Sequence, residues 1–477
     1  MRKALIKVQN CYSWLTTNDD DVALTLWRAL RFREKNYFHS RLYKQKIWDG
    51  FTDFYKKESG RFLTGLLPEV EYALKYLKCE YRIEDERSSF KLDHNNIEDT
   101  FLHQWTPEGQ KPVTLHDYQV DLTNQILKHK RGVIQAPTSA GKTFIMLAIL
   151  KSLPANCPTL ILANRKSLVA QNYETLAEWG FPKIGRLYGT YKEPNTFTCA
   201  TIQSLHKIEK LLPHIRCVIV DEIHDMMSKT PKKMYNKMKL ASMRVAVSAT
   251  PFKFGAKDKT QKYSVKGFFG PVMKTKTAQE GGVLTTKFLQ ERGILSPSHC
   301  VFYPITEPQI PYDVYLDAVT NGIAENWSFH KIVKRLAMGL KGRTLILVER
   351  IAHGDTLANM IPGALWVRGK DNQDTRKQVV DQLKHSDQCV AIATQGIFNT
   401  GINVFVHNLI NAAGGQADHQ IIQRMGRGLR TADDKEQLNY YDFIYKINDY
   451  LEGHSKKRIR ILEEEGHELE IKDEIDF

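Results

Sequence analysis

The stretch Ala136-Pro137-Thr138-Ser139-Ala140-Gly141-Lys142-Thr143 lies between two apolar runs, at residues 132–135 and 144–150. The first run is typical of a short buried strand and the second of a buried helix. Between them, backbone N–H groups can curl around phosphates, Lys142 can reach the outer phosphates, and Thr143 can hold Mg²⁺. Ala136 replaces the first glycine of the usual Walker A pattern, which is tolerable where φ is negative. The stretch therefore predicts a nucleotide-binding loop.

The composition favours a polyanionic partner. The 477 residues include 68 Lys and Arg against 54 Asp and Glu, which gives a net charge of +14 and a pI near 9.2. No apolar run approaches the roughly 20 residues of a membrane-spanning helix, and the N-terminus has no segment of signal-peptide length. Seven isolated cysteines without a C-x-x-C pair argue against structural zinc and against a disulfide framework. We therefore expect a soluble, cytoplasmic protein that contacts no membrane.

Short apolar runs alternate with helical stretches from Val133 onward. The runs typical of buried strands lie at residues 159–163, 217–220, 244–247, 344–348, 388–393 and 407–411. Near-continuous Val, Ile and Leu runs of this kind indicate parallel sheets that helices cover on both faces. The fold class is therefore α/β, and we expect functional residues at the carboxyl ends of the strands.

The composition also divides the chain into regions. We expect an N-terminal domain at 1–100, two α/β domains at 101–284 and 285–450, and a charged C-terminal tail at 451–477. Between Arg28 and Arg61, ten Arg and Lys residues alternate with aromatic residues, which sets the N-terminal region apart. A polar, basic region at about residues 252–300 separates the two blocks of strands, and Gly281-Gly282 is the expected linker inside it.

An acidic pair follows another apolar run, in Cys217-Val218-Ile219-Val220-Asp221-Glu222-Ile223-His224. The pattern places Asp221 at the carboxyl end of a buried strand, beside the Mg²⁺ that Thr143 would hold. Glu222 is then the expected base that orients and activates water. An isolated Asp-Glu pair is usually part of a solvated loop, but the apolar run and the upstream phosphate loop favour a catalytic pair here.

Positive charge near the γ-phosphate is a further requirement of phosphoryl transfer, and Gln423-Arg424-Met425-Gly426-Arg427-Gly428-Leu429-Arg430 can supply it. Arg427 and Arg430 share one helical face, and a guanidinium group matches a pair of phosphate oxygens. The alternative is a basic surface helix. The two glycines are poor helix formers that a solvated face would not need, so they favour a phosphate contact.

The ordered stretches APTSAGKT, DEIH, SAT (Ser248-Ala249-Thr250) and QRMGRGLR resemble the superfamily 2 helicases and translocases, and the resemblance spans roughly residues 112–445. It implies two tandem RecA-like domains that clamp ATP and Mg²⁺ between them. The residues implied at the nucleotide are Gln119 at the adenine, then Pro137, Thr138, Ser139, Ala140, Gly141, Lys142, Thr143 and Gly401. Leu115-His116-Asp117-Tyr118-Gln119 resembles the adenine-reading segment of the family, which often has arginine where His116 stands.

The same resemblance implies roles in hydrolysis and coupling. Arg427 and Arg430 would be arginine fingers, His224 and Gln423 would bridge the two domains, and Ser248 and Thr250 would couple hydrolysis to movement. It also implies a nucleic-acid track whose hydroxyl, amide and cationic side chains suit phosphate contacts. The residues implied there are Arg165, Lys166, Thr201, Gln203, Ser204, Thr394 and Thr400. A Thr-x-x-Ser stretch such as 201–204 is more often a helix cap than a binding site.

The N-terminal region narrows the family. Lys46-Ile47-Trp48-Asp49-Gly50, Phe54-Tyr55 and Gly60-Arg61-Phe62-Leu63-Thr64-Gly65-Leu66-Leu67 resemble the small α+β DNA-recognition domain of phage UvsW-type branch-migration helicases, a domain that XPB-like helicases also have. The resemblance implies that Lys46 and Arg61 contact DNA phosphates and that Trp48 stacks on unpaired bases. The alternative is that Trp48 and Phe62 form the core of this small domain.

The leading hypothesis is an ATP-dependent DNA helicase that remodels branched DNA in recombination, repair or replication, in the host cytoplasm if a phage encodes it. Three alternatives stay open. One is a DEAH-type RNA helicase, because the DEIH stretch does not separate DNA from RNA. Another is the motor subunit of a restriction or repair nuclease. The third is a catalytically silent DNA-binding protein, against which the complete set of motif residues argues.

Overall fold

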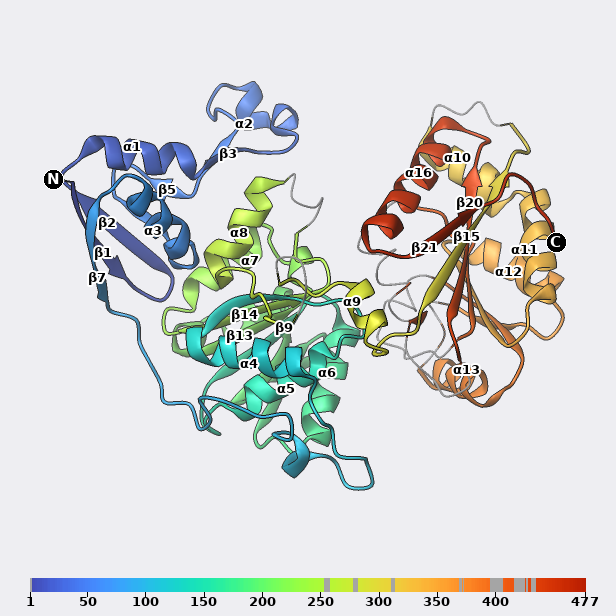
Figure 1. The fold of residues 1–477 in the computed structure, drawn as a ribbon, viewed down its shortest axis with the longest axis horizontal. Coiled ribbons are helices and arrows are strands. Elements are labelled where there is room, and N and C mark those ends of the chain that lie inside the picture. Colours follow the sequence, from blue (N-terminus) through green and yellow to red (C-terminus); the bar gives the residue numbers. More distant parts are fainter. Residues whose placement is uncertain are drawn as a thin grey trace. The chain divides into compact units, whose positions relative to one another are not determined.

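The computed structural model describes residues 2–252, 258–277, 282–309, 314–368, 371, 373–394, 406–415, 425, 428–429 and 435–477. The chain forms two compact units, of which the first comprises Met1–Ala136 with Gly141–Val283 and the second comprises Pro137–Ala140 with Leu284–Phe477. The division falls directly after Val283, the residue that follows Gly282; Gly281 lies outside the described residues. Each unit contains a 7-stranded sheet covered by helices (Figure 1).

The N-terminal part of the first unit is a small α+β domain. Its 5-stranded sheet has the order β5-β6-β2-β1-β7, and a separate β3–β4 ribbon carries the cation-rich segment. Phe62 is buried in its core, beside Ile6, Val22 and Leu26. The elements are β1 (Lys3–Val8), β2 (Tyr12–Thr17), α1 (Asp20–Ala29), β3 (Arg31–Arg33), α2 (Arg41–Lys44), β4 (Phe51–Asp53), β5 (Tyr55–Lys56), β6 (Arg61–Leu63), α3 (Leu67–Tyr76) and β7 (Glu80–Asp85).

The larger part of the first unit has the predicted parallel sheet. Its order is β11-β10-β12-β9-β13-β14-β8, and every described pair is parallel except β10 with β11. The elements are α4 (Asp117–His129), β8 (Arg131–Gln135), α5 (Lys142–Lys151), β9 (Thr159–Ala163), α6 (Lys166–Glu178), β10 (Ile184–Tyr188), β11 (Tyr191–Glu193), β12 (Phe197–Thr201), β13 (Cys217–Asp221), α7 (Lys229–Lys237), β14 (Met243–Ser248) and α8 (Lys259–Phe269).

Helix α8 attaches the N-terminal domain to this sheet. A Cβ atom on Gly65 would lie 2.0 Å from the carbonyl oxygen of Lys266, so only glycine allows the two backbones to approach this closely. Lys266 Nζ also donates to Glu69 Oε1 at 2.7 Å, and the rings of Phe32 and Tyr263 lie 4.4 Å apart. The polar region after residue 252 therefore contributes a helix to the first unit as well as the linker.

A second set of contacts joins the turn between β1 and β2 to the first residues of β8 and β14. Arg131 donates to the carbonyl oxygens of Asn10 and Phe268, and Arg244 donates to Cys11 Sγ at 3.0 Å. Both guanidinium groups are buried. Burial, and next the charge of Arg244, hold the pKa of Arg131 well below its usual value. The N-terminal domain is therefore packed against the motor sheet through buried side chains.

The second unit is built on an all-parallel sheet of order β17-β18-β16-β19-β20-β15-β21. Its elements are α9 (Thr286–Glu291), β15 (Ser298–Ile305), α10 (Tyr315–Val319), α11 (Trp327–Gly339), β16 (Arg343–Val348), α12 (Ile351–Met360), β17 (Leu365–Val367), α13 (Gln373–His385), β18 (Cys389–Thr394), β19 (Asn408–Asn411), β20 (Leu438–Tyr445), α16 (Asp449–Glu464) and β21 (Glu468–Ile471). The charged C-terminal segment thus supplies a helix and an edge strand to this unit.

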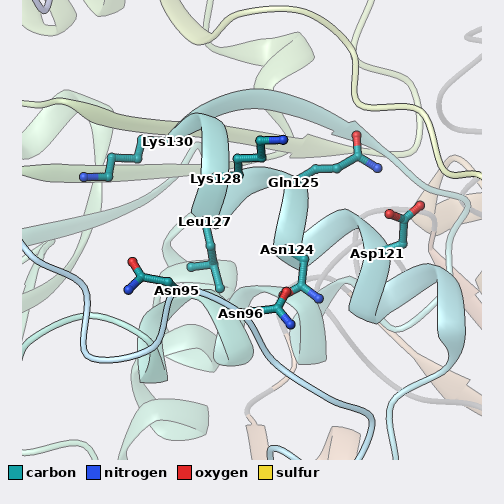
Figure 2. A pocket seen from close by; sticks show the side chains of 8 residues that line it. All are labelled: Asn95, Asn96, Asp121, Asn124, Gln125, Leu127, Lys128 and Lys130. Carbon is teal, nitrogen blue, oxygen red and sulfur yellow. The ribbon is translucent and has the colours of Figure 1, made fainter.

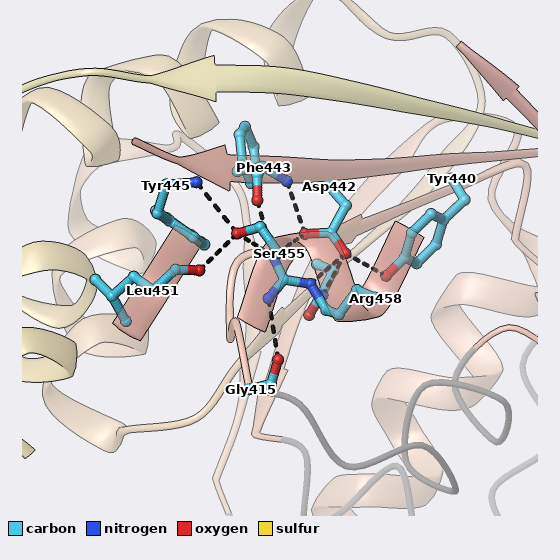
Figure 3. Close-up of polar contacts among 9 residues, drawn as sticks. Gly415, Tyr440, Asp442, Phe443, Tyr445, Leu451, Ser455 and Arg458 are labelled. Atoms are coloured by element: carbon cyan, nitrogen blue, oxygen red, sulfur yellow. Dashed lines mark hydrogen bonds and ion pairs between the residues drawn. The ribbon is translucent and has the colours of Figure 1, made fainter. Parts of the chain in front are cut away.

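A buried ion pair holds α16 against the sheet (Figure 3). Arg458 Nε and Nη2 donate to the two carboxylate oxygens of Asp442, each at 2.9 Å. Asp442 also accepts from Tyr440 Oη at 2.8 Å and from Asn411 Nδ2 at 2.9 Å. Arg458 Nη1 donates to the carbonyl oxygen of Gly415 at 3.0 Å. Burial alone would lower the pKa of Arg458, but the charge of Asp442 outweighs it and raises that pKa.

No helix in the described part of the chain is both long and apolar enough to cross a membrane. All seven cysteines are free thiols; six are buried, and Cys389 is half-buried. The cysteines therefore act mainly as small core residues.

Candidate ATPase site

The phosphate-binding loop leaves β8 and enters α5 as the sequence predicts. Ala136 is buried, has no positive φ and donates its N–H to the carbonyl oxygen of Ser248 at 3.2 Å, so alanine satisfies this position. Gly141, with φ of 74°, caps α5, and Ser139 has φ of 68°. Lys142 Nζ donates to the carbonyl oxygen of Ala136 at 3.2 Å. The lysine thus lies along the loop, and Thr143 is exposed beside it.

Gln119 reaches the same loop from α4. A Cβ on Gly141 would lie 2.2 Å from Gln119 Nε2, so the absence of a side chain at 141 makes room for this amide. Gln119 Oε1 accepts from the N–H of His116 at 2.8 Å, which fixes the orientation of the amide. His116 therefore serves as the N-cap residue of α4, a role that does not require arginine.

Asp221 and Glu222 lie at the carboxyl end of β13, next to β14. Burial, and next the charge of Glu222, raise the pKa of Asp221. Burial would also raise the pKa of Glu222, but hydrogen bonding to His224, with smaller effects from Lys142 and Ser248, lowers it. Glu222 has φ of 54°, a left-handed conformation uncommon outside glycine, so its backbone is held in a strained geometry.

The side chain of Glu222 is fixed by the SAT and DEIH residues together. Ser248 Oγ donates to Glu222 Oε2 at 2.8 Å, and His224 Nδ1 lies 3.1 Å from Ser248 Oγ and 3.2 Å from Glu222 Oε2. The N–H of Thr250 donates to Ser248 Oγ at 3.2 Å. The structure therefore brings the predicted base and three predicted coupling residues into one hydrogen-bonded group.

These residues are chemically suited to ATP and Mg²⁺. Thr138 Oγ1 is buried and has no partner among the described residues, which leaves a donor in the loop for a phosphate oxygen. Gly141 adopts a left-handed conformation as the N-cap of α5, so the N-terminus of this helix, which favours anions, lies at the same loop. Asp221 and the exposed hydroxyl of Thr143 are oxygen ligands of the type that Mg²⁺ prefers. Lys142 supplies the positive charge that phosphates require.

The predicted nucleic-acid residues of the first unit follow the neighbouring strands β9 and β12. Arg165 is the half-buried N-cap residue of α6, and Lys166 is exposed after it. Thr201 and Ser204 are buried and lie 2.9 Å apart through their hydroxyl oxygens, whereas Gln203 is exposed. Thr201 and Ser204 thus contact each other at the start of a 3₁₀ helix, and Gln203 faces solvent.

The N-terminal residues differ in exposure. Lys46 is exposed and has φ of 58°, and Arg61 is exposed and lies over the Tyr12 ring at 4.8 Å. Trp48 is half-buried, and its Nε1 donates to the carbonyl oxygen of Phe51 at 2.6 Å. Phe62 is the core residue that the alternative interpretation expects, whereas Trp48 keeps one part of its ring accessible.

Several predicted residues of the second unit lie outside the described residues: Thr400, Gly401, Gln423, Arg427 and Arg430. Thr394 is described; it is buried and is the last residue of β18. Met425 and Leu429, from the same stretch as the two arginines, are buried, and the carbonyl oxygen of Leu429 accepts from the N–H of Ser296 at 2.8 Å.

Two polar residues that sequence reasoning missed extend the group around Glu222. Asn164 Nδ2 donates to Asp225 Oδ2 at 2.6 Å, and this Asp225 oxygen lies 3.6 Å from His224 Nε2. Asp225 directly follows the DEIH stretch, and Asn164 directly precedes Arg165. Their positions after two neighbouring parallel strands, β13 and β9, were a usable signal.

A pocket of about 410 Å³ lies beside α4 (Figure 2). Its lining is mostly amide and lysine side chains, from Asn95, Asn96, Asp121, Asn124, Gln125, Leu127, Lys128 and Lys130. Asn124 is occupied by hydrogen bonds with the backbone of Ile97. No residue predicted to bind nucleotide or nucleic acid lines this pocket.

Comparisons with known proteins find one family model and several helicase-like relatives. A family model described as the type III restriction enzyme res subunit matches residues 112–253. The ATP-dependent DNA helicase uvsW of Enterobacteria phage T4 is 22% identical over 361 residues, which cover 70% of this chain and 69% of that protein. The DNA 3'-5' translocase XPB2 of Sulfurisphaera tokodaii is 23% identical over 437 residues, covering 79% of this chain and 94% of that protein.

The fold is also found among solved structures. S. cerevisiae Dbp5 bound to RNA and ADP BeF3 has a TM-score of 0.52 and 14% identity, and the alignment covers 76% of this chain and 91% of that chain. This likeness shows the tandem RecA-like architecture. The ordered motifs, the matched family model and the helicase relatives indicate an ATP-dependent helicase, an enzyme that hydrolyses ATP, and the chain is similar to the UvsW-type superfamily 2 helicases.

Proposed function

We propose that the enzyme is a DNA helicase or translocase that uses ATP hydrolysis to remodel branched DNA, in recombination, repair or replication. The main support for ATP hydrolysis is the hydrogen-bonded group of Glu222, His224 and Ser248 at the carboxyl edge of the first sheet. Ser248 ends β14, which pairs with β8, the strand that leads into the phosphate-binding loop. The DNA part is supported by the basic N-terminal domain, and by relatives described as a DNA helicase and a DNA translocase.

In this proposal Lys142 binds the outer phosphates, and Thr143 and Asp221 hold Mg²⁺, which neutralises charge on the phosphates when bound. Glu222 accepts a hydrogen bond from the attacking water and orients it. Ser248 and His224 keep the carboxylate of Glu222 in place. Arg427 and Arg430 would stabilise the charge that develops on the γ-phosphate, Gln423 would bridge the two domains, and Gly401 would bind the nucleotide.

The remaining assignments belong to the same proposal. The domain boundaries are 1–100 for DNA recognition, 101–284 and 285–450 for the two motor domains, and 451–477 for the C-terminal segment. The proposed DNA contacts are Lys46, Trp48, Arg61, Arg165, Lys166, Thr201, Gln203, Ser204, Thr394 and Thr400. The exposed residues among them, such as Lys166 and Gln203, are the strongest candidates for phosphate contacts.

The test is ATP-dependent remodelling of a four-way junction, a fork and a tailed linear duplex, measured side by side. We expect the wild-type chain to prefer the junction and the fork, and Lys142→Ala and Glu222→Gln to lose turnover while they still bind DNA. Normal ATPase in either variant would contradict the assigned roles. Preference for the linear duplex would indicate a processive strand separator instead.

An RNA helicase is the second candidate, because the fold is shared with a protein whose structure contains RNA. Stimulation of the ATPase by structured RNA, compared with junction DNA at equal nucleotide concentration, separates the two. Stronger stimulation by RNA would overturn the DNA assignment and leave the ATPase assignment standing.

A further inference from the structure

Polar side chains form a continuous row along the carboxyl edge of the first sheet. Asn164 follows β9, Asp225 follows β13, and Ser248 ends β14, and these three strands are direct neighbours. The row begins beside Arg165 and Lys166, which are proposed to contact DNA, and it ends at the catalytic Glu222. The row therefore connects the proposed DNA-binding residues with the proposed catalytic base.

The contacts in the row involve side chains alone. Asn164 Nδ2 donates to Asp225 Oδ2 at 2.6 Å, and the same oxygen lies 3.6 Å from His224 Nε2. On its other side the His224 ring approaches Ser248 Oγ at 3.1 Å and Glu222 Oε2 at 3.2 Å. His224 is 2% exposed, so the ring is held between these two sets of partners.

Hydrogen counting fixes the direction of one bond. A serine hydroxyl has one hydrogen, and Ser248 Oγ donates it to Glu222 Oε2 at 2.8 Å. His224 Nδ1 must therefore be a donor, directed toward Ser248 Oγ and Glu222 Oε2, which leaves Nε2 toward Asp225. A rotation of the ring would disturb the bond that orients Glu222, and the carboxylate of Asp225 opposes such a rotation.

Asn164 forms the outer end of the row, and within the described part of the chain its amide is bound on one side only. Its Nδ2 is bound to Asp225, whereas its Oδ1 is buried and has no partner among the described residues. The amide is thus anchored on one side. Asn164 directly precedes Arg165 in the chain. A DNA strand that binds Arg165 and Lys166 would therefore pull on the backbone that carries the Asn164 amide.

We infer that Asn164 and Asp225 are positioning residues that couple DNA binding at Arg165 and Lys166 to the orientation of Glu222 through His224. The inference rests on the proposed function, since it assumes that the enzyme hydrolyses ATP in response to DNA. Neither residue is among those assigned to the nucleotide, so both are expected to act on kcat through other side chains.

The experiment measures steady-state ATPase over a range of ATP concentrations, with saturating junction DNA, for Asn164→Ala, Asp225→Ala and the double variant. We expect each single variant to lower the DNA-stimulated kcat about tenfold and to change KM for ATP less than about twofold. The double variant should lose no more than either single variant, because both substitutions break the same chain of contacts.

Asn172→Ala is the matched control. Asn172 lies on α6, and its Nδ2 is buried without a partner among the described residues, so it resembles Asn164 without the bond to Asp225. We expect its kcat to equal that of the wild-type chain. Asn164→Leu, which is similar in size to asparagine, replaces Asn164→Ala if thermal unfolding shows that the smaller side chain destabilises the protein.

The outcomes are distinct. Equal kcat values for Asn164→Ala and Asn172→Ala, or additive losses in the double variant, would overturn the inference and leave the proposed function standing. A loss of ATPase that appears at limiting DNA and is absent at saturating DNA would also overturn it, because the role would then be DNA binding. A wild-type chain without DNA-stimulated ATPase would overturn the proposed function and this inference together.

Discussion

Arg244 in the first unit and Arg458 in the second are the two arginines of the described chain that are less than 2% exposed, and they are stabilised in different ways. Arg458 in the second unit faces a carboxylate, Asp442, with two hydrogen bonds of 2.9 Å. Arg244 in the first unit donates to three backbone carbonyl oxygens and to Cys11 Sγ. No Asp or Glu oxygen of the described chain lies within 4.0 Å of Arg244.

The two sites differ in the acceptor groups that remain buried when the arginine is removed. A buried carboxylate that loses its arginine keeps a full charge in a medium that solvates it poorly. Carbonyl oxygens that lose an arginine are dipoles, and two of the three that bind Arg244 also accept a backbone N–H: Tyr235 from Met238 and Met238 from Ala241, each at 3.3 Å. The second unit should therefore be the more sensitive to loss of its arginine.

The largest effect is expected from Arg458→Met. It leaves Asp442 buried and uncompensated, and the free energy of unfolding should fall by about 3–5 kcal/mol. Urea denaturation of the full chain measures this. The control is the double variant Asp442→Leu with Arg458→Met, which removes both charges and should recover most of the loss; equal stability of the single and double variants would contradict the account.

A smaller effect is expected from Arg244→Met. The methionine fills much of the same space and strands no charge, so the free energy of unfolding should fall by about 1–3 kcal/mol through incompletely satisfied carbonyl groups. The same denaturation experiment applies. A loss larger than that of Arg458→Met would show that the contact with the N-terminal domain, where Arg244 meets Cys11, dominates over the charge.

The pH dependence adds a third comparison, because the second unit also buries neutral histidines. Burial, and next the charge of His330, lower the pKa of His353 to about 3, and burial lowers the pKa of His467 to about 4. Unfolded histidine binds a proton near pH 6.5 and these folded residues do not. Their contribution to stability is thus complete above pH 6.5 and is lost as pH falls toward 4.

Each of these histidines should lower the free energy of unfolding by about 1.4 kcal/mol for each pH unit by which the pH falls in that window. Denaturation of the full chain at pH 7 and pH 5 measures the difference, and His353→Leu should reduce it. A stability that rises between pH 7 and pH 5 would contradict the assignment of neutral histidines.

The smallest effect is expected from Gly453→Ala in α16, the helix that carries Arg458. A Cβ there would meet no atom within 4 Å, and Gly453 has no positive φ. Alanine should therefore stabilise the helix by about 0.5–1 kcal/mol. An unchanged unfolding midpoint would show that tertiary contacts such as the Asp442 pair, and not helix propensity, limit the stability of α16.

The local parts of the fold and site could be predicted from sequence. Continuous apolar runs such as 159–163 and 217–220 correspond to β9 and β13, and the strand-to-helix context of Lys142 identified the phosphate loop. The pairs Asn164–Asp225 and Asp442–Arg458 could not be predicted, because each joins residues that only the sheet topology brings together. The buried face of α16 was equally hidden, since half of its 16 residues are charged.

Helix α8 has a mechanical consequence. Its 11 residues span about 16 Å at the usual rise of an α-helix. One part of it carries the backbone contact with Gly65 and the ion pair with Glu69, while Gln261 Nε2 donates to the carbonyl oxygen of His224 at 3.2 Å. A load on the N-terminal domain is thus transmitted along a helix whose other end contacts the loop that carries His224, so under the proposed function strain from bound DNA would reach the ATPase site through α8.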